Sequence, residues 1–177
     1  MKQFNLSQWT DNYSNINESS LSVIEKCLVI IHSCCCTDDK LNALYNLYRW
    51  ADSKSEKENV KLIYEYYRFV LQQLCADVEG SLYVFKDKDN PDSIWETDTY
   101  SGFINKIDAC TNAIVVERYV PTEQGLQKLI SVNYNVLNGV LCEDGFTLNR
   151  ILAQADFEED DIEKFNKAEQ LLNLSAE

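Results

Sequence analysis

The stretch SEKENVKLIYEYYRFVLQQL, residues 55–74, shows helical periodicity more strongly than any other part of the chain. Its opening residues Ser55 to Glu58 match a capping box, in which the serine and the glutamate each accept a hydrogen bond from a free backbone amide. Apolar side chains recur every three or four residues, as they do along one side of a helix: Val60, Ile63, Tyr64, Tyr67, Val70, Leu71 and Leu74. We predict a long amphipathic helix here, ended by Gly80.

Similar spacing on both sides of this stretch predicts further helices. Upstream, Ser19 or Ser20 caps a helix over 21–31, and Thr37 caps a helix with acids in its first turn, where the dipole favours negative charge. Downstream, the spacing predicts a helix over 103–114 and another that Thr122 caps and Gly145 breaks. It also predicts a short helix over 147–152 and a last helix from 156–160 to 172.

Only residues 81–98 depart from the helical pattern. Residues 81–85 and 93–97 alternate around a turn-rich segment, which fits a short β-hairpin, although a loop or an irregular helix fits equally well. The predicted fold is an all-α, single-domain bundle of about seven helices with at most one small hairpin near 81–98. The domain spans residues 1–177 and begins with a polar segment at 1–18.

The chain of 177 residues is strongly acidic. Its 16 lysines and arginines oppose 29 aspartates and glutamates, a formal net charge of −13, which argues against direct contact with nucleic acid or an anionic membrane. No apolar segment follows Lys2 as a signal peptide requires, and the longest apolar run, residues 27–31, is far short of the ~20 residues that cross a bilayer. We therefore expect a cytoplasmic protein without membrane contact.

The negative charge gathers toward the C-terminal end. Between residues 143 and 163, eight acids oppose one base, Arg150, so this segment carries 8 − 1 = 7 of the 13 net negative charges. Helix capping and pairing with following lysines explain part of this excess, but four adjacent acids exceed what capping needs. We predict either a solvated face or a partner-binding face, made of Glu143, Asp144, Asp156, Glu158, Glu159, Asp160, Asp161 and Glu163.

A small acidic chain with no catalytic motif, and with this acidic set, resembles the immunity proteins of bacterial toxin systems, including contact-dependent growth inhibition. The resemblance implies a non-enzymatic protein without a cofactor. Such a protein would bind a cognate basic partner, typically a toxin nuclease domain, and block its active site or substrate face. Charge complementarity of this kind speeds association and enforces specificity.

Three alternatives stay open. A helical adaptor would bind its partner through an apolar groove, with Trp9, Trp50 and Trp95 as candidate anchors. A thiol- or metal-dependent protein would use the cluster of His32 with Cys34–Cys36, but a zinc site needs a second ligand pair that the spacing does not provide, so no metal is expected. The seven cysteines, odd in number, are expected to be free thiols. An acidic mimic of nucleic acid would need carboxylates spread in a track.

Overall fold

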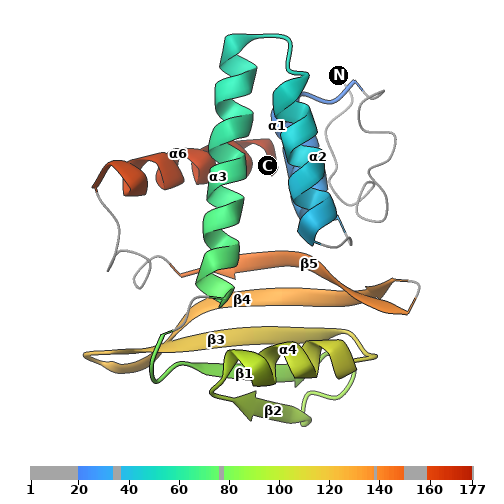
Figure 1. Cartoon of the computed structure of the whole chain (residues 1–177), viewed down its shortest axis with the longest axis vertical. Helices are drawn as coiled ribbons and strands as arrows, with labels where there is room; N and C mark the ends of the chain where they lie inside the picture. Colours follow the sequence, from blue (N-terminus) through green and yellow to red (C-terminus); the bar gives the residue numbers. More distant parts are fainter. Residues whose placement is uncertain (1–19, 34–36, 76–77, 138, 150–158, 177) are drawn as a thin grey trace. The chain divides into compact units, whose positions relative to one another are not determined.

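The computed structural model describes residues 20–33, 37–75, 78–137, 139–149 and 159–176. These residues form helices and strands in the order shown in Figure 1: α1 (Val23–His32), α2 (Thr37–Arg49), α3 (Lys54–Cys75), β1 (Leu82–Asp87), β2 (Ile94–Thr97), α4 (Tyr100–Ala109), β3 (Ile114–Thr122), β4 (Gly125–Leu137), β5 (Val140–Leu148) and α6 (Glu159–Ala176). The chain divides into two compact units, with one boundary inside α3 between Phe69 and Val70. The helical unit holds α1, α2, the first part of α3 and α6; the sheet unit holds the end of α3, the strands and α4.

An antiparallel sheet of five strands, in the order β2-β1-β3-β4-β5, overturns the predicted all-α fold. The protein is mixed α/β. The helix predicted over 103–114 ends at Ala109, and Ile114 begins β3. The helix predicted after Thr122 is strand β4, and Leu148, predicted to be helical, ends β5. Residues 150–152 of the short helix predicted there lie outside the described residues.

The helices predicted in the helical unit are confirmed, with corrected starts. Ser22, not Ser19 or Ser20, caps α1 and accepts a hydrogen bond from the amide of Glu25 at 3.2 Å. Helix α3 begins one residue before the predicted capping box: the Ser53 hydroxyl accepts from the amide of Glu56 at 3.2 Å, and the Glu56 carboxylate accepts from the amide of Asp52 at 3.1 Å. The serine and the glutamate thus satisfy two free amides, as a capping box does, but two residues earlier than predicted.

The core of the helical unit joins helices that are far apart in the sequence. The ring of Phe165 in α6 stacks on Phe69 of α3, with centroids 4.2 Å apart. The hydroxyl of Tyr66 donates to the Glu169 carboxylate at 2.8 Å. Lys40 is fully buried, and its ammonium donates to the carbonyl of Ile31 at 2.8 Å, which satisfies an acceptor in the last turn of α1.

The sheet unit packs α4 against one face of its sheet (Figure 1). Phe103 of α4 stacks on Tyr83 of β1 with centroids 4.6 Å apart, and it also meets Phe85. Arg118 of β3, 1% exposed, is paired with Tyr83 across the strands and lies over its ring. The Arg118 guanidinium donates to the carbonyl of Gln73 at 2.8 Å, so it holds the end of α3 to the sheet.

Of the alternatives open for residues 81–98, the structure shows the hairpin, formed by β1 and β2. Asp87 builds its turn, because one carboxylate oxygen accepts from the amides of Asp89 at 2.8 Å and Asn90 at 3.2 Å. An aspartate that binds the following backbone amides in this way is a common turn former. The hairpin is stable here because it is two strands of a larger sheet.

Candidate functional site

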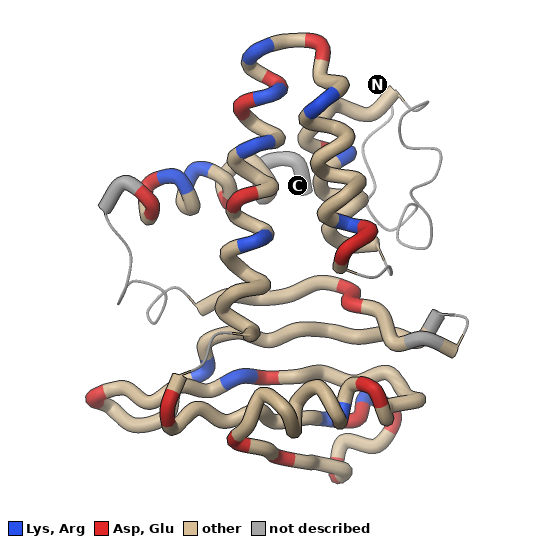
Figure 2. The backbone as a smooth tube through the Cα atoms, viewed as in Figure 1, with Lys and Arg blue, Asp and Glu red and all other residues tan. Residues whose placement is uncertain are grey.

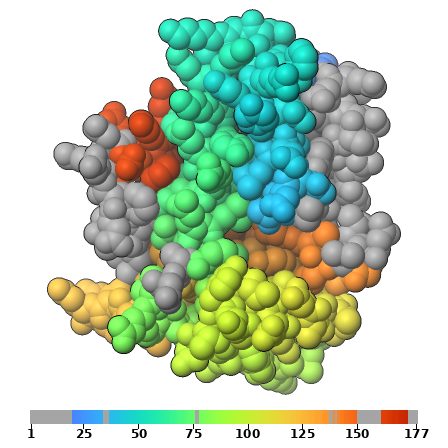
Figure 3. All heavy atoms as spheres, viewed as in Figure 1, coloured from blue at the N-terminus to red at the C-terminus, as the bar shows by residue number. Residues whose placement is uncertain are grey.

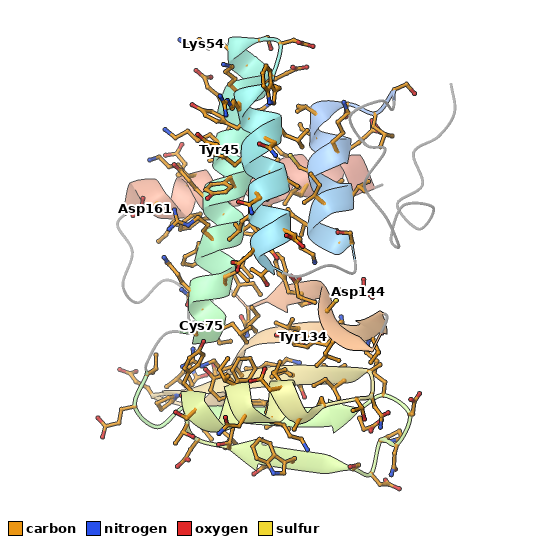
Figure 4. The ribbon with its side chains drawn as sticks, turned by 45° about the vertical axis from the view of Figure 1, so that its right-hand side comes forward. Tyr45, Lys54, Cys75, Tyr134, Asp144 and Asp161 are labelled. Atoms are coloured by element: carbon orange, nitrogen blue, oxygen red, sulfur yellow. The ribbon has the colours of Figure 1, made fainter. Side chains whose placement is uncertain are left out.

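The eight acids of the predicted partner-binding face lie on different parts of the fold. Glu143 and Asp144 belong to β5 in the sheet unit, whereas Asp161 and Glu163 belong to α6 in the helical unit (Figure 4 labels Asp144 and Asp161). The backbones of Glu159 and Asp160 lie in the first turn of α6. Asp156 and Glu158 lie outside the described residues. Whether the accessible acids among the eight act as one face stays a prediction.

Glu143 is buried, with 6% of its surface exposed. It pairs across the strands with Tyr134 of β4, so both side chains lie on the same face of the sheet. Burial raises the pKa of Tyr134 well above its usual range, and the charge of Glu143 raises it further. In this position Glu143 serves the packing of β5 and does not meet solvent.

Asp144 is half-buried and already bonded within the sheet unit. Its carboxylate accepts a hydrogen bond from the side-chain amide of Asn135, whose oxygen accepts from the ammonium of Lys88 at 3.3 Å. The strand register shifts beside this position, and Gly145 takes a φ of 102° there, a conformation that favours glycine. Asp144 therefore lies at a β-bulge and is bonded to Asn135.

The acids of α6 are more accessible than those of β5. Glu163 is exposed and Asp161 is half-buried. Both follow the start of a helix that Phe165 and Glu169 attach to α3. The helix dipole favours negative charge in the first turn. Some of these acids are therefore explained by their place in α6, with no need for a partner protein.

A second acidic segment lies along the edge strand β2 and its flanking turns. From Asp89 to Asp98 the chain carries four acids and no base: Asp89, Asp92, Glu96 and Asp98. Every residue from 88 to 96 is exposed, and so is Asp98. Figure 2 shows acidic positions recurring along this part of the tube, and Figure 3 shows atoms of α4 and the neighbouring chain, in yellow-green, exposed on the same face. The count of acids per ten residues could have revealed this segment; its exposure could not be read from the sequence.

The described bases of the sheet unit are engaged with the protein's own groups. Lys86 and Lys128 both form ion pairs with Glu117, the latter at 3.0 Å. Burial alone would raise the pKa of Glu117, but hydrogen bonds and charge from the two lysines outweigh it and hold the pKa below its ordinary value. The ammonium of Lys106 lies 5.3 Å from the centre of the Trp95 ring. Arg118 is buried, and Lys86, Lys88 and Lys106 keep their charge beside β2, where the four acids from Asp89 to Asp98 outnumber them.

The tryptophans proposed as anchors differ in their surroundings. Trp50, 75% exposed, lies beside a cavity of about 460 Å³ between the ends of α1, α2 and α3, which Leu21, Val23 and Leu47 also line. Arg49 lies 5.6 Å over the Trp50 ring. Trp95 is on β2, and Trp9 lies outside the described residues.

Of the predicted cluster of His32 with Cys34–Cys36, the three cysteines lie outside the described residues. Within the part of the chain that the structure describes, no group of three histidine, cysteine or acidic residues is placed to hold a metal ion. Of the described cysteines, Cys27 is buried, and burial raises the pKa of its thiol to about 12, whereas Cys75 is exposed at the end of α3 (Figure 4). No helix within the described ranges is long and apolar enough to pass through a bilayer.

Comparison of the chain with protein-family models, curated proteins and solved structures finds no match. The function is therefore argued from the residues and their geometry.

Proposed function

We propose that this protein is a non-enzymatic binding protein that neutralises a basic partner protein through acidic surface, as an immunity protein inhibits its cognate toxin nuclease. The observation that carries the proposal is the exposed segment 88–98 of the sheet unit, in which four acids oppose only Lys88. Lys86 and Lys128 share the Glu117 carboxylate, and Lys106 lies over the Trp95 ring, so the four acids still outnumber the bases beside β2. Surplus negative charge on a surface steers a positively charged partner toward it.

The predicted acids of α6 remain part of the proposal. Asp161 and Glu163 add to the acidic surface of the helical unit. Glu143 does not contribute in the folded chain, because it is buried. A cytoplasmic location is also proposed, since a toxin that attacks nucleic acid is neutralised where its substrate lies.

The test uses the protein encoded by the neighbouring reading frame as the probe. We expect this product to arrest growth when expressed alone, and co-expression of the full chain to restore growth. Neutralising Asp89, Asp92 and Asp98 to asparagine should weaken the complex about tenfold or more at low salt and flatten its salt dependence, because screened charge pairs are lost. Neutralising Asp161 and Glu163 tests α6 in the same way.

The matched control neutralises Glu58 and Glu65, two exposed acids of α3 that lie outside both acidic segments. This variant should bind as the wild type does. A neighbouring product that neither arrests growth nor binds the purified chain would contradict the immunity function. Unchanged affinity and salt dependence in both neutralised variants would contradict the acidic surface.

One observation favours a second candidate, an adaptor that binds through the cavity beside Trp50. Binding of that kind depends on apolar contact, so it would persist at high salt and fail in Trp50→Ala. The acidic-surface variants would then bind normally. The two candidates therefore give opposite results in the same assay.

A further inference from the structure

The outer edge of β2 presents unpaired strand backbone. Among the described strands, β2 is the last in the sheet and pairs only with β1. The amide of Asp87 donates to the carbonyl of Ser93, so alternation along the ladder directs the backbone groups of Trp95 and Thr97 toward β1. The N–H and C=O groups of Ile94 and Glu96 then point away from β1, in the direction in which another strand would add.

The side chains at this edge are exposed although the strand is held firmly. Ile94 is 55% exposed and Trp95 is 39% exposed. On the inner side, Trp95 meets Phe85 edge-on with centroids 5.1 Å apart. An edge strand that is fixed from one side and open on the other can take up an extended segment with little loss of its own conformational freedom.

The connection from β2 to α4 also fixes the edge. Thr99 caps α4, since its hydroxyl accepts from the amide of Gly102 at 3.0 Å. A Cβ added at Gly102 would collide with the Thr97 hydroxyl, so the glycine permits this close approach of strand and helix. The edge is therefore built into the fold, in contrast to a loose loop end.

The charge around the edge selects one kind of occupant. Asp89, Asp92, Glu96 and Asp98 flank or lie on β2 without an intervening base. A second copy of this chain would place these acids against their own duplicates, and like charges at close range are unfavourable. A segment rich in lysine or arginine would instead find carboxylates on both sides of Ile94.

We infer that the outer edge of β2 binds an extended, lysine- or arginine-rich segment of the partner protein, which adds to the five-stranded sheet as one further strand. The backbone groups of Ile94 and Glu96 bond to the added strand, Ile94 contacts an apolar side chain on it, and the flanking acids pair with its bases. This inference rests on the proposed function, because it takes the partner to be basic.

The first experiment needs no natural partner. A blocked peptide of alternating lysine and valine is titrated into the full chain, and amide hydrogen exchange is followed by NMR. We expect the amides of Ile94 and Glu96 to exchange at least about tenfold more slowly with the peptide bound. A glutamate–valine peptide should give no protection, and a lysine–valine peptide methylated on alternate backbone nitrogens should bind about tenfold more weakly or worse, because it cannot complete the ladder.

The methylated peptide tests the ladder on the wild-type protein, so the result does not depend on whether a β2 variant folds. Two substitutions test it on the protein: Glu96→Pro removes the backbone N–H that points away from β1, and Glu96→Gln removes only the charge. Proline is tolerated on an outer edge, so we expect Glu96→Pro to lose peptide binding and Glu96→Gln to weaken it only partly. Binding of the peptide without protection of Ile94 and Glu96, or equal binding of its methylated form, would overturn the inference.

The second experiment separates this inference from the proposed function. The neighbouring-frame product is tested against wild type and Glu96→Pro. If the product is neutralised equally by both while the peptide leaves Ile94 and Glu96 unprotected, the edge inference is wrong and the proposed function stands. If the product does not bind but the peptide protects both amides, the proposed function is wrong and the edge still binds basic strands. Failure of both probes would overturn both.

Discussion

The two edge strands of the sheet, β2 and β5, differ sharply in exposure. Ile94, Trp95 and Glu96 of β2 are exposed, whereas Cys142 and Glu143 of β5 are buried. Both strands carry glutamate, so composition does not distinguish them. Glu143 on β5 is packed within the protein, whereas Glu96 on β2 is exposed to solvent. Whether an acid of this sheet is accessible therefore depends on which edge strand carries it.

The largest effect is expected beneath the exposed edge, at Phe103. Its ring packs on Tyr83 and Phe85, and it holds α4 against the strands beside β2. Phe103→Ala should lower the free energy of unfolding by about 3–5 kcal/mol, because a buried aromatic leaves a cavity. Urea denaturation followed by circular dichroism measures this loss. Ser101→Ala, at an exposed position of the same helix, should change it by less than about 0.5 kcal/mol. Equal effects of the two substitutions would show that α4 does not support the sheet.

A direct comparison of the two edges uses the same substitution on each. Glu143→Ala on β5 should lower the free energy of unfolding by about 2 kcal/mol, because it removes a buried side chain that packs beside Tyr134 and leaves a cavity. Glu96→Ala on β2 should change it by no more than about 0.5 kcal/mol. Both values come from the same denaturation experiment. If Glu96→Ala proved the more harmful, the assignment of a buried and an open edge would be reversed.

The helices of the helical unit could be predicted from the sequence because their signals are local. Capping residues and apolar spacing identify α1, α2, α3 and α6 within a few residues, and the turn around Asp87 and Pro91 makes a hairpin one of the open alternatives for residues 81–98. These elements need no information from distant parts of the chain.

Strands β3 and β4 were missed because their apolar residues also fit helical spacing. Along β4, Leu129 and Ile130 follow Leu126 at intervals of three and four, as in a helix, and the register shift opposite Arg118 and Tyr119 disturbs the alternation expected of a strand. The β-branched residues Val115, Val116 and Val120 of β3 favour a strand independently of the spacing.

The candidate site was only partly predictable, because charge is visible in a sequence and exposure is not. The acid count selected Glu143 and Asp144, which β5 buries or bonds to Asn135. It passed over Asp92 and Glu96, which the fold exposes. Exposure depends on which strand ends the sheet, and strand order is set by pairing between distant segments.

Glu117 lies on β3, the central strand of the sheet, and its ion pairs predict how stability depends on pH. Glu117 has a pKa below its ordinary value of 4.5, so its ion pairs stabilise the fold fully above that pH and are lost as pH falls through the folded-state pKa. The free energy of unfolding of the wild type should fall as the pH is lowered from 6 to 3. In Glu117→Gln we expect this fall to be smaller by about 1 kcal/mol. Denaturation at both pH values measures it, with Glu96→Gln as a control that should leave the loss unchanged. An unaltered pH dependence in Glu117→Gln would show that the two lysines do not stabilise its carboxylate.

The smallest effect on stability is expected at Ile94, and it tests the open edge most directly. An exposed apolar residue on an edge strand invites pairing with other chains, and a lysine there discourages it. Ile94→Lys should therefore change the free energy of unfolding by no more than about 0.5 kcal/mol, while it reduces aggregation on heating, as light scattering would show. A loss above about 1 kcal/mol would mean that Ile94 is covered in the folded chain, because only a buried side chain contributes that much. The β2 edge would then be closed to an added strand, and the contrast with β5 would disappear.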